Sequence, residues 1–126
     1  MEKQFIEASN APAPIGPYNQ AVLVNNMLFI SGQIALVPST GSLNNASIED
    51  ETHQVMNNLK AILYQAEMDF SHVVKTTIFL TDMSLFGSVN EIYAKYFKGN
   101  FPARETVAVK GLPRNVNVEI SMIAVK

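Results

Sequence analysis

Apolar and polar positions along the chain repeat with two different periods, and a strand-like period comes first. Residues 19–36 contain two β-rich runs on either side of Asn25-Asn26, a pair that tolerates left-handed turn conformations. This pattern predicts a hairpin. Residues 72–82 are rich in β-branched residues and short enough for one strand, and residues 105–113 and 117–126 are two further strand-like runs joined by a Gly-Leu-Pro turn.

Two segments instead repeat their apolar residues at helical spacing. The first predicts a helix over residues 48–67, with Ser47 as its N-cap and acids in its first turn. The second begins after Asp82 or Ser84, either of which can cap it, and is expected to end near Gly99. Its apolar side carries Phe86, Val89, Tyr93 and Phe97. The order of strands, helix, strand, helix and strands predicts an α+β fold with both helices packed on one face of a sheet.

The run at residues 115–125 places one acid, Glu119, among uncharged residues. Because strand side chains alternate between faces, one face is continuously apolar and Glu119 lies on the other. The apolar face comprises Val116, Val118, Ile120, Met122 and Ala124. Spacing alone favours a strand with one solvent-exposed face, where an acid is ordinary, over a strand that points Glu119 into a pocket.

Composition bounds the size of the protein and its classes of partner. A chain of 126 residues without low-complexity segments predicts one domain over residues 1–126. Its 48% hydrophobic and 16% charged content is apolar for this size, so we expect another subunit to cover part of the surface. A net charge of −2 offers no broad field for nucleic acid or anionic lipid.

Several kinds of site and location are disfavoured. The chain has no cysteine, which excludes disulfides and thiolate chemistry, and His53 and His72 have no metal-ligand spacing, so we expect no metal. The N-terminal residues lack the apolar core of a signal peptide, and the apolar stretches are shorter than a membrane span. A cytoplasmic protein without membrane contact is therefore expected.

Three polar positions lie where the backbone is unusual. Tyr18 follows the stiff segment PIGP, and Ser31-Gly32 interrupts a strand, which marks either a bulge or the close approach of a ligand. Arg104 follows Pro102 at the start of a strand and could bind a carboxylate through two N–H groups, although a surface ion pair is the commoner arrangement. With Glu119, these residues could bind a small anionic substrate.

Five segments occur in order along nearly the whole chain: GPYNQAV, LFISGQIAL, VVKTTIFLTDMSLFGSVNEIYAKYF, PARETVAV and LPRNVNVEISMIAV. Together they resemble the Rid family, the reactive-intermediate imine deaminases also called YjgF-like proteins. The resemblance implies a chorismate-mutase-like fold with a mixed sheet, assembled as a homotrimer with sites in the clefts between subunits.

The same resemblance implies an enzyme that needs no cofactor. Its substrates would be 2-enamine and 2-imine acids such as 2-aminoacrylate, 2-iminopropanoate and 2-iminobutanoate, hydrolysed to 2-keto acids and ammonia. Pyridoxal-phosphate-dependent dehydratases release such intermediates, which implies a functional link to those enzymes. A non-catalytic module that senses 2-keto acids is the alternative, and ribonuclease activity fits the acidic chain poorly.

The resemblance also implies roles for particular residues. Arg104 in PAR matches the arginine that holds the substrate carboxylate, and Glu119 in NVEI matches the acid that orients the attacking water. The substrate-binding positions around them are matched by Tyr18, Ser31, Gly32, Asn90 and Thr106. Many family members have serine-cysteine where this chain has Glu105-Thr106, so a new charge is expected beside Arg104 and the substrate preference is open.

Overall fold

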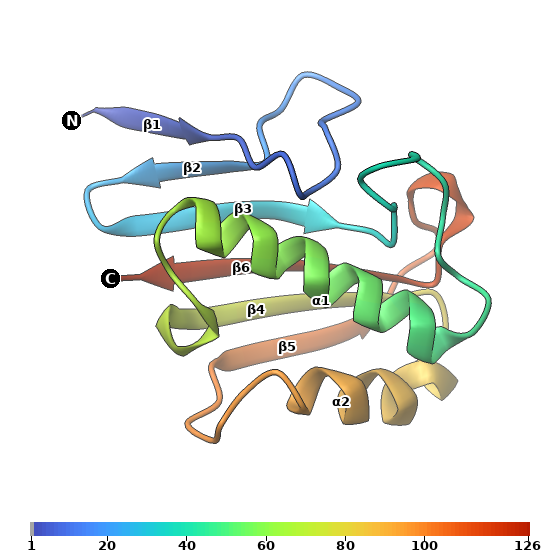
Figure 1. The fold of residues 1–126 in the computed structure, drawn as a ribbon. Coiled ribbons are helices and arrows are strands. Elements are labelled where there is room, and N and C mark those ends of the chain that lie inside the picture. Colours follow the sequence, from blue (N-terminus) through green and yellow to red (C-terminus); the bar gives the residue numbers. More distant parts are fainter. Residues whose placement is uncertain (1) are drawn as a thin grey trace.

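The computed structural model describes residues 2–126, which form one mixed β-sheet with two α-helices on one of its faces (Figure 1). The helices are α1 (Ile48–Gln65) and α2 (Phe86–Ala94). The strands are β1 (Lys3–Ile6), β2 (Ala21–Val24), β3 (Met27–Gln33), β4 (Val73–Leu80), β5 (Ala103–Ala108) and β6 (Val118–Val125). The predicted α+β class and the placement of both helices are therefore confirmed.

The strands described here lie in the order β1-β2-β3-β6-β4-β5. All neighbours run antiparallel except β4 and β5, which run parallel and are joined by α2. Such a parallel pair needs a crossover connection, and the helix supplies it. The last two strand-like runs correspond to β5 and β6, whose connection contains a 3₁₀ turn at Pro113–Asn115, and β4 lies between these two strands in the sheet. The short strand β1 was not predicted.

The predicted hairpin is confirmed. β2 pairs with β3, and Asn25 between them has φ 55°, the left-handed conformation that asparagine tolerates. The register between β3 and β6 shifts between Ile30 and Gln33, so Ser31-Gly32 forms a bulge.

The first helix follows its sequence signals more closely than the second. Ser47 caps α1 by accepting a 3.0 Å hydrogen bond from the Asp50 backbone N–H, and the helix ends within two residues of the predicted boundary. Asp82 instead caps a short 3₁₀ turn, Met83–Leu85, that precedes α2. Phe97 therefore lies beyond the end of α2, although it still packs against the core.

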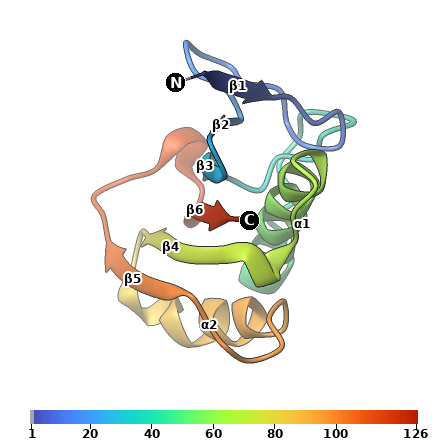
Figure 2. The same cartoon turned by 90° about the vertical axis from the view of Figure 1, so that its left-hand side faces the viewer.

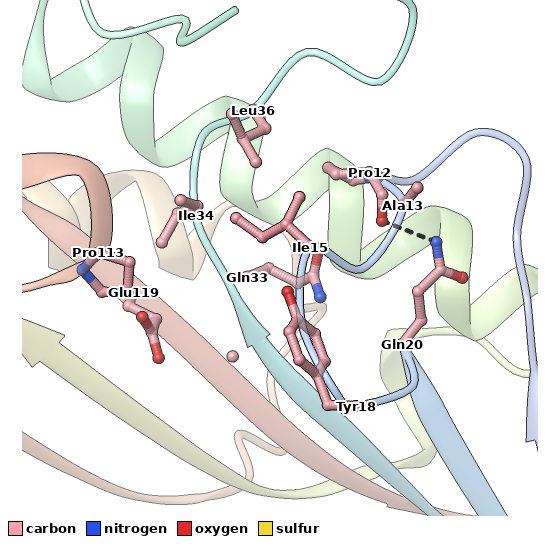
Figure 3. A pocket seen from close by; sticks show the side chains of 11 residues that line it. Pro12, Ala13, Ile15, Tyr18, Gln20, Gln33, Ile34, Leu36, Pro113 and Glu119 are labelled. Atoms are coloured by element: carbon pink, nitrogen blue, oxygen red, sulfur yellow. Dashed lines mark hydrogen bonds between the residues drawn. The ribbon is translucent and has the colours of Figure 1, made fainter. Parts of the chain in front are cut away.

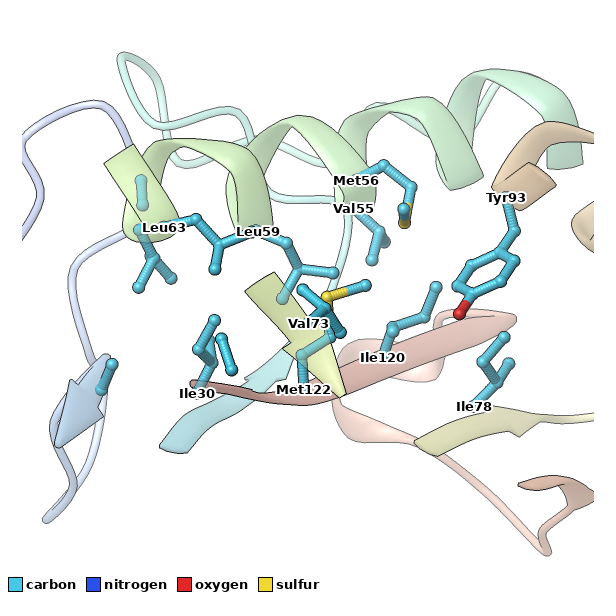
Figure 4. Close-up of a cluster of buried hydrophobic side chains, with 14 of the residues drawn as sticks. Ile30, Val55, Met56, Leu59, Leu63, Val73, Ile78, Tyr93, Ile120 and Met122 are labelled. Atoms are coloured by element: carbon cyan, nitrogen blue, oxygen red, sulfur yellow. The ribbon is translucent and has the colours of Figure 1, made fainter. Parts of the chain in front are cut away.

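The main core lies between the helices and the sheet (Figure 4). Val55, Met56, Leu59 and Leu63 of α1 face apolar residues of β3, β4 and β6, with Tyr93 of α2 beside them. In β6 the buried residues are Val118, Ile120, Met122 and Ala124, which confirms the predicted apolar face. Figure 2 shows a curved sheet with α1 and α2 on the same side, so within residues 2–126 its other face carries no α-helix and is called the helix-free face below.

Candidate active site

Arg104 lies on β5, the outer strand of the sheet, and points towards the helices. It pairs in register with Thr76, whose buried hydroxyl accepts a 3.0 Å hydrogen bond from Tyr93 of α2. The Arg104 guanidinium donates a 2.7 Å hydrogen bond from Nη1 to Oδ1 of Asn90. Its central carbon lies 5.5 Å from the Phe86 ring centroid and 5.1 Å from that of Tyr93. The two rings and the amide thus fix the guanidinium by packing, cation–π contact and one hydrogen bond.

No acidic side chain within residues 2–126 forms a salt bridge with Arg104. The surface ion pair, which was the commoner arrangement for a strand-end arginine, is therefore absent from this part of the chain. The guanidinium borders the Arg104 cavity, a hollow of about 470 Å³. The cavity is lined by Asn90, Tyr93, Ala94, Phe101, Pro102 and Arg104. An arginine held by aromatic rings and lacking a carboxylate partner can receive a carboxylate ligand.

Glu119 borders a second hollow, the Glu119 cavity (Figure 3). Tyr18 and Ile15 stand on one side of it, and Glu119 and Pro113 on the other. The whole lining consists of Pro12, Ala13, Ile15, Tyr18, Gln20, Gly32, Gln33, Ile34, Leu36, Pro113 and Glu119. Its volume of about 70 Å³ is enough for several water molecules. The strand therefore points Glu119 into a pocket, the arrangement that spacing alone did not favour.

Burial raises the pKa of the Glu119 carboxyl above the ordinary glutamate value of 4.5. Most of the cavity wall is apolar, and Tyr18 is the other titratable group among its lining residues. Among residues 2–126, no lysine, arginine or histidine lines this cavity to lower the pKa again. A carboxyl in such surroundings can exchange a proton at a pH nearer neutrality than an exposed acid can.

Gly32 lets the Glu119 carboxylate lie against the backbone of β3. A methyl group on Gly32 would overlap the Glu119 carboxylate. The sequence predicted either a simple bulge or the close approach of a ligand at Ser31-Gly32. The structure shows a bulge whose glycine is approached by the Glu119 side chain.

Gly32→Ala should push the Glu119 carboxyl out of its cavity towards water. We expect the pKa of Glu119 to fall towards the ordinary value, because its desolvation is relieved. A carboxyl-carbon NMR titration of Glu119 measures this. The matched control is Gly87→Ala in α2, where an added methyl meets no atom within 4 Å beyond its chain neighbours and the backbone of its own helix, and it should leave the titration unchanged. An unchanged Glu119 pKa in Gly32→Ala would show that the carboxyl adapts without leaving the cavity.

Arg104 and Glu119 lie on opposite faces of the sheet. Arg104 pairs with Thr76, which is buried under the helices, whereas Glu119 pairs with Phe79 on the helix-free face. The two cavities share no lining residue. One copy of the chain therefore does not bring these two groups to one small ligand.

The expected charge beside Arg104 is absent, because Glu105 points to the helix-free face. Its carboxylate accepts a hydrogen bond from Thr77 and forms a 3.0 Å ion pair with Lys75. These contacts lower the pKa of Glu105, with the Thr77 hydrogen bond as the largest cause. Consecutive strand residues face opposite ways, and the prediction of a charge next to Arg104 ignored that alternation.

Three of the other predicted site residues line one of the two cavities, and two line neither. Tyr18 and Gly32 line the Glu119 cavity, and Asn90 lines the Arg104 cavity. The Ser31 hydroxyl instead donates a 2.6 Å hydrogen bond to the Asn19 carbonyl. Thr106 lies on the same face as Arg104, and its buried hydroxyl has no hydrogen-bond partner within residues 2–126.

Sequence reasoning missed the residue that holds the loop beside Tyr18. Gln20 is buried, and its side chain bonds the Ala8 N–H at 2.6 Å and the carbonyl of Pro12 at 2.9 Å. A glutamine one residue before an apolar strand carries no signal that distinguishes it from a surface residue. Among residues 2–126, no group of three or more histidine, aspartate or glutamate side chains could hold a metal ion, and no helix could cross a membrane.

Comparison with known proteins places the chain among close relatives. Residues 8–126 match the model of the family described as endoribonuclease L-PSP. The mouse protein named 2-iminobutanoate/2-iminopropanoate deaminase is 49% identical over 124 residues, which cover 98% of this chain and 92% of the relative. The chloroplastic Reactive Intermediate Deaminase A of Arabidopsis thaliana is 48% identical over 98% of this chain, which spans 66% of that relative's length.

Solved structures show the same fold. The crystal structure of E. coli TdcF with bound serine superposes with a TM-score of 0.94 at 38% identity, and the match covers 98% of each chain. Agreement of this quality along almost the whole chain extends to the mixed sheet and both helices. The arrangement of the two cavities is thus built on a fold that occurs in known proteins.

Proposed function

The chain belongs to the Rid family, since residues 8–126 match the model described as endoribonuclease L-PSP and relatives carry imine-deaminase names. From this membership we propose that it hydrolyses 2-imino and 2-enamine acids to 2-keto acids and ammonia. Relatives that are nearly half identical carry deaminase names for this chemistry. A related structure that holds serine supports a ligand with an amino-acid carboxylate. The expected substrates are 2-aminoacrylate, 2-iminopropanoate and 2-iminobutanoate.

The observation that decides how the proposed site is built is the separation of Arg104 and Glu119. A carboxylate anchor and a proton-transfer group must both reach one substrate of a few atoms, yet Arg104 and Glu119 lie on opposite faces of the sheet. Arg104 on the outer strand of one subunit would meet the Glu119 cavity of a neighbour. We therefore propose a composite active site, formed at each subunit boundary of a homotrimer.

The helix-free face supports this assembly because it leaves large apolar side chains in water. Met27, Phe29 and Val107 are 39%, 42% and 43% exposed on this face. Apolar residues clustered on one face of a sheet commonly mark a contact between proteins. The edge of β5 adds unpaired backbone groups next to the same face.

The reaction follows from the chemistry of the C=N bond. Arg104 holds the carboxylate, and Glu119 accepts a proton from a water molecule as the water oxygen bonds to the imine carbon. The electron pair of the C=N bond moves to nitrogen, which takes a proton from solvent or arrives already protonated. Glu119 then returns its proton to the amine nitrogen, the C–N bond breaks, and the hydroxyl loses its proton as the 2-keto acid forms and ammonia leaves.

The neighbouring residues have supporting roles in this proposal. Asn90 orients the Arg104 guanidinium through its amide oxygen. Tyr18 and Gly32 form the wall against which the imine lies, and Ser31 fixes the bulge through the Asn19 carbonyl. Thr106 is proposed to contribute chiefly its backbone to carboxylate binding.

The activity is tested by generating 2-iminopropanoate with an amino-acid oxidase and trapping it with semicarbazide. The protein is expected to suppress semicarbazone formation, because hydrolysis competes with trapping. Absence of suppression with several amino-acid precursors would contradict the deaminase proposal. Tight binding of 2-keto acids by calorimetry in that case would identify a metabolite-sensing module.

Ribonuclease activity, which the family description names, has little support in this chain. The net charge is −2, and both histidines have structural contacts outside the two cavities. His53 Nδ1 bonds the Tyr96 hydroxyl at 2.7 Å, and His72 Nδ1 accepts the Asp69 N–H at 3.0 Å. Neither ring is placed to exchange protons beside Arg104 or Glu119.

A further inference from the structure

Glu51 is a buried acid to which the proposed reaction gives no part. It lies in the first turn of α1 and is fully buried. Acids at this end of a helix are usually exposed and interact favourably with the helix dipole. Glu49 and Asp50 in the same turn are exposed acids of this kind. Complete burial of a carboxylate is costly unless hydrogen bonds compensate it, so its partners indicate its purpose.

The partners of Glu51 are concentrated at the start of β6. Its Oε2 accepts hydrogen bonds from the backbone N–H of Asn117 at 2.7 Å and of Val118 at 3.2 Å. Its Oε1 accepts a 2.9 Å hydrogen bond from the Asn117 side-chain amide. No cation forms a salt bridge with Glu51 within residues 2–126. The hydrogen bonds from these N–H groups therefore offset the cost of burying its carboxylate. Both carboxylate oxygens therefore hold one short piece of backbone.

That piece of backbone connects directly to the Glu119 cavity on both sides. Glu119 follows Val118 in the chain, and Pro113, four residues before Asn117, lines the cavity. Between them Arg114 and Asn115 have φ 57° and 56°, a left-handed conformation that asparagine tolerates but that is unfavourable for arginine. The surrounding structure holds this loop in place: Arg114 Nη1 donates a 3.4 Å hydrogen bond to the Gly41 carbonyl, and Glu51 accepts hydrogen bonds from the backbone at the end of the loop.

The far side of Asn117 is also tied down. Its carbonyl accepts a 3.1 Å hydrogen bond from the Thr81 N–H, just beyond β4. Asn117 thus joins α1 to the end of β4, and Glu119 lies two residues away. We propose that Glu51 is a positioning residue, which fixes the orientation of Glu119 and the Pro113 wall for water attack. This inference rests on the proposed deaminase function.

The test compares Glu51→Gln with Glu49→Gln, an exposed acid in the same turn. Glutamine is nearly isosteric, but its amide nitrogen would face an N–H donor, so one part of the anchor is lost. We expect Glu51→Gln to lower kcat by about tenfold to a hundredfold, the usual effect of a small displacement of a reacting group. The Kd of a 2-keto acid should stay within about twofold, because Arg104 on β5 holds the carboxylate. Glu49→Gln should match the wild type in both.

The split between kcat and Kd separates positioning from loss of folded protein. If Glu51→Gln only destabilises the fold, kcat per folded molecule below the melting temperature will equal that of the wild type, and the inference is wrong. If this variant does not fold, Asn117→Ser is assayed instead, because it removes one donor and keeps the backbone bonds. A smaller fall in kcat at unchanged Kd supports the inference, and wild-type kinetics overturn it. If the wild-type protein itself shows no turnover, the deaminase proposal is wrong.

Discussion

Glu119→Gln is expected to lower kcat for imine hydrolysis by about a hundredfold to ten-thousandfold, the range for loss of a general acid–base group. The amide cannot accept a proton from water, yet it has almost the same shape in a cavity of about 70 Å³. The Kd of a 2-keto acid should therefore change little. Single-turnover kinetics and calorimetry on the same preparation measure the two quantities.

The pH profile provides an independent check on Glu119. Because the carboxylate is the form that accepts the proton, kcat of the wild type should rise with pH through the pKa of Glu119. Burial raises that pKa, so the acid limb is expected above 4.5, and Glu119→Gln should lack it. Glu67→Gln, at an exposed acid beyond the end of α1, should retain the limb. Wild-type kcat in Glu119→Gln would rule out its role as the base.

Arg104→Ala is expected to reduce kcat/KM by about thirtyfold to a thousandfold, equivalent to about 2 to 4 kcal/mol of lost carboxylate binding. The guanidinium has a free edge towards the Arg104 cavity, since Asn90 occupies one of its N–H groups and aromatic rings hold its faces. Its loss should also weaken 2-keto acid binding, in contrast to Glu119→Gln. Initial rates at low substrate and calorimetry measure both effects.

Arg104→Lys is the informative companion to the alanine variant. Lysine keeps the charge but loses the planar fork and its stacking against Phe86 and Tyr93. An intermediate kcat/KM is expected. If Arg104→Ala binds 2-keto acids as the wild type does, another group must hold the carboxylate, and the proposed anchor is wrong.

The parts of the fold that depend on local signals could be predicted from sequence. Ser47 and the apolar repeat after it defined α1, and Asn25-Asn26 defined the hairpin, because caps and turns are set by neighbouring residues. Strand alternation also placed Glu119 correctly on the face opposite the core. In each case the interaction involved lies within a few residues of the signal.

Features that depend on strand order could not be predicted in this way. The turn expected between the last two strand-like runs says nothing of their order in the sheet, and β4 in fact lies between them, since that order depends on the crossover through α2. The same limitation affected the site. From the sequence, Arg104 and Glu119 were predicted to bind the same small anionic substrate. The strand register instead places them on opposite faces of the sheet.

Buried polar residues were the least predictable part of the site. Gln20 and Glu51 are each buried against backbone groups far away in sequence. Their neighbours in the chain give no indication of those partners. Glu105 shows the reverse error, because proximity in sequence to Arg104 was taken for proximity in space, although its contacts are with Lys75 and Thr77.

A mixture of two inactive variants tests the composite site most directly. Arg104→Ala and Glu119→Gln subunits are denatured together in equal amounts, refolded and assayed for imine hydrolysis. In a trimer with shared sites, about a quarter of the sites regain both residues, one from each of two neighbouring subunits. The account predicts recovery to about a quarter of wild-type activity. Activity no higher than that of the separately refolded variants, in trimers shown to contain both kinds of subunit, would contradict it.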